Sequence, residues 1–131
     1  AEWKTRDTGV PGLKRVYGLE FKEFKPFDSS GTLLVEALKN GQADAVNLYT
    51  TDPNIAANGF VSLEDPKNFF VPQQVVPVVG KDVAAKLAPT LNAVSAKLDT
   101  PTLADMVKQV VLDKADVAKV AKEFLAKNAL S

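Results

Sequence analysis

Two patterns of apolar residues divide the chain near residue 80. Before that point, apolar and polar residues alternate in short runs such as Leu19–Lys22 and Ala43–Tyr49, and a period of two is typical of strands. After it, apolar residues recur every three or four positions, which is typical of helices that pack on one face. The sequence therefore predicts an α/β ligand-binding lobe over residues 1–80 and a C-terminal helical segment over residues 81–131.

The front segment predicts a strand–helix–strand unit between residues 19 and 49. Apolar residues at positions 33, 34, 37 and 38 share one helical face. Asp28–Ser30 precedes them, and side chains of this kind accept the free N–H groups of a first helical turn. Asn40–Gly41 follows them and is typical of a left-handed helix end. The short return loop favours a parallel strand pair with a right-handed crossover.

Further strands complete the front segment. They are expected at Phe60–Leu63 and at Val75–Val79, and a short helix is expected near Ile55. Together with the strand–helix–strand unit, these strands would form a parallel-rich sheet. The predicted fold class is therefore α/β, followed by C-terminal helices.

Three helices are expected in the rear segment. The first carries Pro89, whose ring should break or kink it, because proline lacks the N–H group that a helix interior needs. Thr100–Pro101 opens the second helix, and Asp116 opens the third with an acceptor for its first turn. A boundary near Gly80 separates the two segments, and each is small to fold alone.

The composition excludes several functional classes. Sixteen Lys and Arg residues balance sixteen Asp and Glu residues, so no net charge attracts nucleic acid. The chain has no Cys and no His, which excludes the nucleophiles, thiolate metal sites and acid–base groups that depend on them. Asp44, Asp52 and Asp65 are expected in caps and turns. We therefore expect no catalytic residues, no metal and no cofactor.

One segment is a candidate for a binding site on composition alone. Asn47–Asp52 ends a predicted parallel strand in a run of hydrogen-bonding side chains. In open α/β sheets, ligands bind outside the carboxyl ends of the strands. The alternative is that the run is only a strand end, followed by a helix that begins at Asp52–Pro53.

Several short motifs occur in an order and at a spacing that resemble one protein family. They are Glu2–Arg6, Pro11–Leu13, Tyr17–Gly18, Ala37–Gly41, Tyr49–Asp52, Leu63–Asp65, Phe69–Phe70, Pro77–Val79 and Val120–Leu125. Together they cover nearly the whole chain and resemble the second lobe of the glycine betaine/choline-binding proteins, which are substrate-binding proteins of ABC transporters.

This resemblance implies a periplasmic-binding-protein-like fold of type II, in which two lobes enclose the ligand. It also implies how the ligand is held. A quaternary ammonium has no N–H group to donate, so a box of aromatic rings surrounds it. The carboxylate of betaine is met by an Arg, because the guanidinium fork matches two carboxylate oxygens.

Carried over by position, the resemblance assigns ligand-binding roles to four residues. Arg6 resembles the carboxylate-binding Arg, and Tyr49 resembles a tyrosine of the aromatic box, with Thr50 beside it. Gln73 falls where the family often has another box tyrosine, and a Gln offers hydrogen bonds in place of a ring, which allows a ligand that differs from simple betaine. Two alternatives stay open: Arg6 as a surface ion-pair former, and Tyr49 as a half-buried strand residue.

The resemblance also implies partners and a location. The ligand would be glycine betaine, choline or a related quaternary amine, used as an osmoprotectant. An ABC transporter permease would be the partner, at an extracytoplasmic location, either periplasmic or anchored to the membrane at the cell surface. A two-lobed receptor also needs a first lobe, which is missing here. The rear helices would pack on it, so their uncovered apolar faces favour self-association, with a homodimer as the simplest arrangement.

Two other functions fit the same scaffold. Effector-binding domains of transcription regulators use a related two-lobe architecture, and fold alone does not fix function. An attached DNA-binding segment would favour that alternative, and none is visible. An enzyme is disfavoured because the chain has no His, no Cys and no paired carboxylates.

Overall fold

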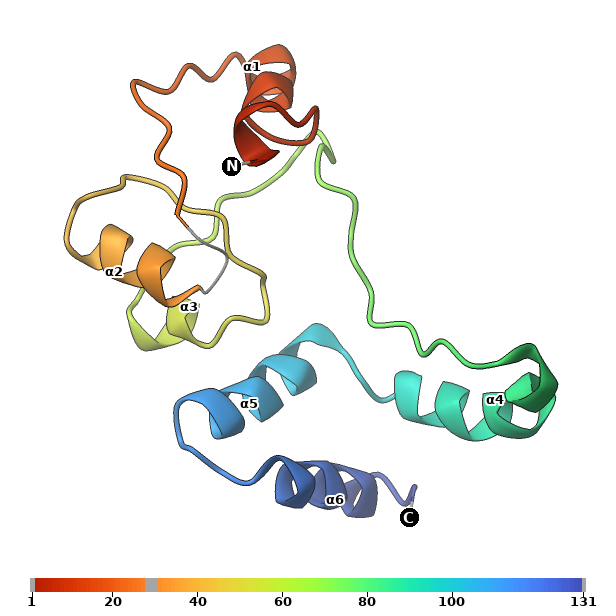
Figure 1. The fold of residues 1–131 in the computed structure, drawn as a ribbon. Coiled ribbons are helices and arrows are strands. Elements are labelled where there is room, and N and C mark those ends of the chain that lie inside the picture. Colours follow the sequence, from red (N-terminus) through yellow and green to blue (C-terminus); the bar gives the residue numbers. More distant parts are fainter. Residues whose placement is uncertain (1, 28–30, 131) are drawn as a thin grey trace. The chain divides into compact units, whose positions relative to one another are not determined.

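The computed structural model describes residues 2–27 and 31–130, which form two compact units. The first unit consists of Ala1–Leu48 with Val61–Pro72, and the second of Tyr49–Phe60 with Gln73–Ser131. The regular secondary structure of both units, within the described residues, is helical (Figure 1). The boundary expected near Gly80 stays a prediction.

The first unit carries a short 3₁₀-helix, η1 (Glu2–Lys4), and two α-helices, α1 (Val10–Tyr17) and α2 (Thr32–Lys39). Pro11 lies in the first turn of α1, where the missing N–H of proline costs nothing. The helix ends at Gly18, whose φ of 70° lies in the left-handed region that glycine adopts without strain.

The helix predicted in the middle of the front segment is confirmed as α2. Val35 and Ala37 on this helix are buried and form the core of the first unit. The helix is followed by Asn40 and by Gly41, which has a φ of 65°, so the predicted helix end is also confirmed. The predicted start signal, Asp28–Ser30, lies outside the described residues.

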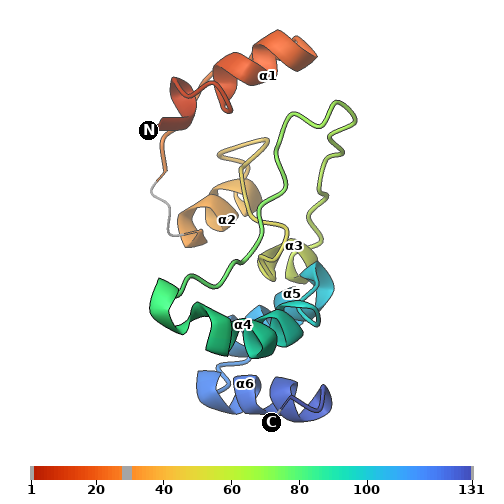
Figure 2. The ribbon, with the colours of Figure 1, turned by 90° about the vertical axis from the view of Figure 1, so that its right-hand side faces the viewer.

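The second unit contains α3 (Asn54–Ala57), α4 (Lys81–Ser95), α5 (Thr100–Val111) and α6 (Val117–Lys127). α5 and α6 pack against each other as a helical hairpin, and they lie side by side in both views (Figures 1 and 2). The short helix predicted near residue 55 and the three predicted rear helices are therefore confirmed.

Acidic side chains begin the last two helices. The Asp99 carboxylate accepts a hydrogen bond from the N–H of Thr102 at 2.8 Å, and Asp116 accepts one from the N–H of Lys119 at 2.9 Å. Each carboxylate also faces the positive end of its helix. By contrast, α4 runs through Pro89 as one helix, so the chain does not break at that proline.

The predicted parallel-rich sheet is wrong, and with it the α/β fold class, because the described residues contain no strand. The segments expected as strands, residues 19–22, 43–49, 60–63 and 75–79, carry no regular structure. Alternation of apolar and polar residues favours an extended backbone, but a strand also needs a neighbour that completes its hydrogen bonds. No such neighbour is present within the described part of the chain.

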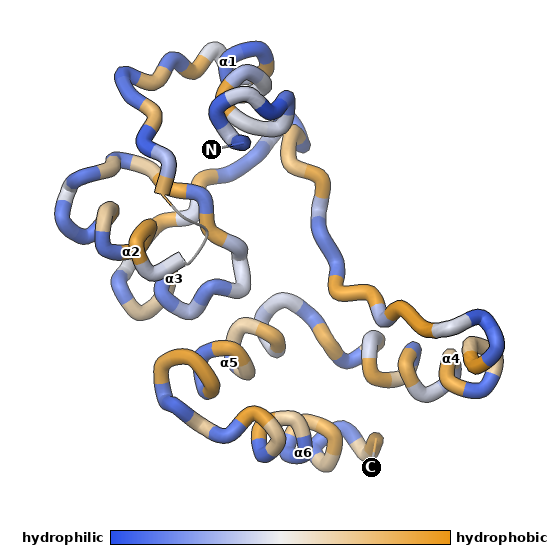
Figure 3. The backbone as a smooth tube through the Cα atoms, viewed as in Figure 1, coloured by the Kyte–Doolittle hydropathy of each residue, from blue (hydrophilic) through white to orange (hydrophobic). Residues whose placement is uncertain are grey.

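Apolar side chains in these segments are consequently exposed. Val61 and Leu63 are 83% and 84% exposed, and Val78 is 92% exposed. Figure 3 shows the same hydrophobic character along the extended segment that leads into α4. None of the described helices is long and apolar enough to cross a bilayer.

Candidate ligand-binding site

Arg6 lies in an exposed turn that joins η1 to α1. Its N–H donates to the carbonyl of Glu2 at 2.8 Å, and its carbonyl accepts from the N–H of Gly9 at 2.9 Å. Its side chain is exposed and forms no ion pair with any residue that the structure describes. Arg15, in contrast, is held by Asp7, with Nη2 and Oδ2 3.1 Å apart. The guanidinium of Arg6 is therefore available to an anionic ligand.

An aromatic cluster, which consists of Trp3, Tyr17, Phe69 and Phe70, supports this turn. Trp3 stacks on Phe70 with ring centroids 6.0 Å apart. Phe69 meets Phe70 edge-on at 4.7 Å and Tyr17 edge-on at 6.4 Å. Gly12 of α1 is buried, and a Cβ at this position would lie 2.5 Å from Cζ of Phe69. A glycine is therefore needed for the ring to approach the helix so closely.

A carboxylate holds the aromatic cluster against α1. Asp65 accepts hydrogen bonds from the hydroxyl of Tyr17 and from the N–H groups of Phe69, at 3.0 Å, and Phe70, at 2.8 Å. The N–H of Lys67 donates to the Tyr17 hydroxyl oxygen at 3.0 Å. We call Asp65 and its three donors, Tyr17, Phe69 and Phe70, the Asp65 latch.

The latch shifts the pKa of both its titratable groups. The hydrogen bond from the Tyr17 hydroxyl, and then the N–H of Phe70, lower the pKa of Asp65 below its ordinary value. Burial, and then the hydrogen bond to Asp65, raise the pKa of Tyr17. At neutral pH the hydroxyl can therefore donate to a charged carboxylate. The sequence predicted a turn at Asp65, but Tyr17 is 48 residues away and no local signal pairs the two.

Tyr49 and Thr50 are exposed and lie at the start of the second unit. The Tyr49 side chain is 72% exposed. Its carbonyl accepts from the N–H of Asp52 at 2.9 Å, and Oδ1 of Asp52 accepts from the N–H of Asn54 at 2.9 Å. This turn leads directly into α3. Both the exposure and the local structure disagree with Tyr49 as a half-buried strand residue.

The four predicted ligand-binding residues fall in different units. Arg6 belongs to the first unit, whereas Tyr49, Thr50 and Gln73 belong to the second. Gln73 is exposed, in the extended segment before α4. Each side chain is therefore open to a ligand within its own unit, and their joint action on one ligand stays a prediction.

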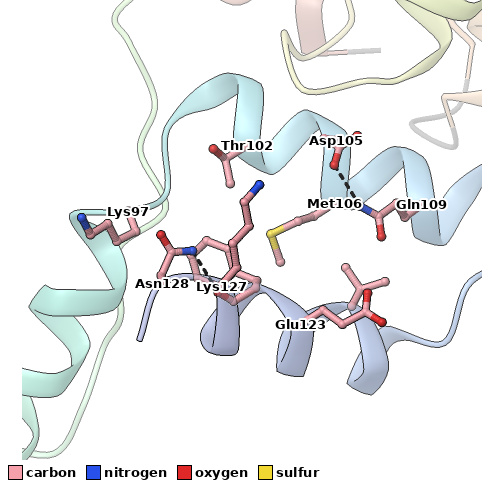
Figure 4. Close-up of a pocket in the computed structure, with 10 residues that line it drawn as sticks. Lys97, Thr102, Asp105, Met106, Gln109, Glu123, Lys127 and Asn128 are labelled. Carbon is pink, nitrogen blue, oxygen red and sulfur yellow. Dashed lines mark hydrogen bonds between the residues drawn. The ribbon is translucent and has the colours of Figure 1, made fainter. Parts of the chain in front are cut away.

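A hollow of ≈ 250 Å³ lies between α5 and α6 and contains none of the four predicted residues. Figure 4 labels its polar lining and one Met: Lys97, Thr102, Asp105, Met106, Gln109, Glu123, Lys127 and Asn128. Asp105 accepts a hydrogen bond from Gln109 at 2.8 Å. The lining mixes acidic, basic and apolar groups, so it offers no single chemistry to a ligand. Within the described residues, no group of three or more acidic side chains could hold a metal ion.

The family described as the substrate-binding domain of ABC-type glycine betaine transport systems matches residues 1–127. This chain belongs to that family. The resemblance that the sequence motifs predicted is therefore confirmed. Membership places the chain among the substrate-binding proteins of ABC transport, and this is a class of transport proteins rather than of enzymes.

Known relatives match the chain along most of its length. It is 29% identical over 130 residues to the carnitine transport binding protein OpuCC of Listeria monocytogenes, covering 96% of this chain and 42% of that protein. It is 27% identical over 133 residues to the glycine betaine-binding protein YehZ of Escherichia coli, covering 95% and 44%. A crystal structure of a glycine betaine/carnitine/choline ABC transporter is similar with a TM-score of 0.80 and 29% identity, covering 98% of this chain and 48% of that chain. The chain thus spans about half the length of these relatives.

Proposed function

We propose that this chain is one lobe of an extracytoplasmic solute-binding protein that binds glycine betaine, choline or a related quaternary amine for ABC-type import. The family match over residues 1–127 carries the proposal, and the relatives named for carnitine and glycine betaine support it. The protein acts by binding and release. The regulator alternative gains no support, because these relatives are transport proteins.

The exposed side chains suit the two ends of such a ligand. The ring face of Tyr49 attracts a trimethylammonium group through its electron-rich surface. The guanidinium of Arg6, which no described residue pairs, offers a two-pronged contact to a carboxylate. The hydroxyl of Thr50 and the amide of Gln73 add neutral hydrogen bonds. Gln73 favours a ligand with a further polar group beyond those of simple betaine.

The same proposal gives the chain its partners. The first lobe of the receptor closes over the ligand, and an ABC permease receives the ligand. The relatives are about twice as long as this chain, which is consistent with a further lobe. Without that lobe, the exposed apolar segments of this chain favour contact between two copies.

Calorimetric titration of the two-lobed receptor that carries this chain tests the site. The variant Arg6→Ala should lower the affinity for glycine betaine by about 10- to 100-fold, because a hydrogen bond to a charged group is lost. Choline has no carboxylate, so its affinity should fall by less than about two-fold. Lys4→Ala is the matched control, since Lys4 is an exposed cation at the end of η1, two residues before Arg6. Equal losses for both ligands would remove Arg6 from the carboxylate role.

A further inference from the structure

The Asp65 latch and the turn that carries Arg6 lie in the same unit. One carboxylate fixes two neighbouring backbone amides, those of Phe69 and Phe70, and the hydroxyl of Tyr17 at the end of α1. The two amide hydrogen bonds fix the loop Asp65–Phe70 on itself, and the bond from Tyr17 ties that loop to α1. The rings of that loop are therefore placed by Asp65 rather than by a buried core.

The turn that carries Arg6 depends on contacts from outside itself. Among the described residues of the turn, Gly9 alone is buried. The turn is closed by backbone hydrogen bonds such as that from Arg6 to Glu2. Trp3 of η1, which directly precedes the turn, stacks on Phe70 of the latch. The position of Phe70 therefore helps to decide where the turn lies.

A second contact path joins the latch to the same turn. Phe69 packs on Gly12, where a Cβ would lie 2.5 Å from the ring and 2.0 Å from the carbonyl oxygen of Asp7. The backbone of α1 at Gly12 therefore lies close both to the ring of Phe69 and to Asp7, the residue that follows Arg6. Displacement of Phe69 would loosen this packing.

We propose that Asp65 is a positioning residue for Arg6. By fixing the loop that carries Phe69 and Phe70 and tying it to α1 through Tyr17, the Asp65 carboxylate keeps the turn where the Arg6 guanidinium meets the carboxylate of the ligand. Asp65 itself does not touch the ligand. The inference rests on the proposed function, because it assigns Asp65 to the same site. It follows that loss of the latch affects ligands with a carboxylate and spares choline.

The first arm of the test needs no ligand. Trp3 is the single tryptophan of the chain, so its fluorescence reports directly on the contact with Phe70. Asp65→Ala should shift the emission to longer wavelength and increase quenching by acrylamide. Asp65→Asn keeps one acceptor oxygen and should show an intermediate effect. Asp99→Ala is the matched control, because Asp99 also accepts a backbone N–H but lies in the other unit.

The second arm measures affinity in the two-lobed receptor. Asp65→Ala should lower the affinity for glycine betaine by about ten-fold, which is the coupling expected between residues in one contact network. The affinity for choline should change by less than about two-fold, and Asp65→Asn should restore part of the affinity for betaine. In an Arg6→Ala background, Asp65→Ala should have no further effect on betaine, because the group that it positions is gone.

Each unfavourable result is informative. An unchanged Trp3 signal in Asp65→Ala would show that the carboxylate does not hold the turn. Equal losses for betaine and choline, or additive losses in the double variant, would reduce Asp65 to a residue of general stability. An unmodified receptor that binds neither ligand would reject the proposed function, and with it the role of Asp65 toward a ligand. The fluorescence measurement would still decide whether Asp65 holds the contact between Trp3 and Phe70.

Discussion

At the scale of single residues, an exposed tyrosine offers a ligand two separate groups, a ring face and a hydroxyl. Tyr49 is largely exposed, so both are accessible. For a quaternary ammonium, which donates no hydrogen bond, the ring face supplies the attraction, worth about 0.5–2 kcal/mol according to how far water is excluded.

Two substitutions at Tyr49 separate these groups. Tyr49→Ala should reduce the affinity of the two-lobed receptor for glycine betaine by about 3- to 30-fold, while Tyr49→Phe should keep most of it. Calorimetry on both variants measures the difference. If Phe is as harmful as Ala, the hydroxyl carries the contact and Tyr49 is not a box residue.

The sequence offered candidate residues for a site, but it did not show their surroundings. Family motifs predicted Arg6 and Tyr49 as ligand-binding residues, which stays a prediction, and their exposure came only with the structure. Asp65 was expected in a turn, which its bonds to Phe69 and Phe70 bear out. Its partner Tyr17 could not be found, because a contact over 48 residues leaves no local pattern.

At the scale of the elements, α1 packs against the latch through a glycine. Gly12→Ala should destabilise the first unit by about 1–3 kcal/mol, the usual cost of overpacking. The new Cβ would meet the carbonyl oxygen of Asp7 at 2.0 Å, and backbone cannot turn away as a side chain can. This outweighs the gain in helix propensity of about 1 kcal/mol.

Urea unfolding monitored by Trp3 fluorescence measures this loss. Gly80→Ala is the control, because the nearest atom to its new Cβ is the end of the flexible Asp82 side chain, and a change below about 1 kcal/mol is expected. A Gly12→Ala variant as stable as the unmodified chain would show that Phe69 does not pack closely on α1.

The elements differ in how far the sequence could predict them. Helices α2, α5 and α6 follow from local signals, such as the cap at Asp116 and the glycine at position 41. The predicted strands were wrong. Alternation of apolar and polar residues over a segment such as Phe60–Leu63 describes only one strand and says nothing of the neighbouring strand that it must pair with. Whether a second edge is present is decided by residues distant in the chain, which periodicity does not report.

At the scale of the whole molecule, the chain exposes more surface than its mass requires. Its accessible surface is 10141 Å², whereas a folded monomer of this mass exposes about 6,700 Å² and two separate units of half the mass about 8,000 Å². The excess includes valines such as Val61 and Val78. Apolar surface of this extent favours association.

The 131-residue chain alone should therefore self-associate. Light scattering should give a mass that rises with concentration to that of a dimer or larger. Val78→Lys should lower the measured mass, because it places a charge in the exposed apolar segment. A chain that stays monomeric at high concentration would show that these segments need no partner.

The same chain should bind betaine weakly, since one lobe leaves part of the ligand in water.

The most direct test of the proposed function compares glycine betaine with glycine, titrated calorimetrically into the two-lobed receptor that carries this chain. Both ligands have a carboxylate, and they differ in the three methyl groups that remove every N–H donor from the nitrogen. A site of ring faces should bind glycine betaine and leave glycine without measurable heat, because the ammonium of glycine would lose its hydrogen bonds to water. A receptor that binds glycine as tightly as betaine, or binds neither, would contradict a quaternary-amine site.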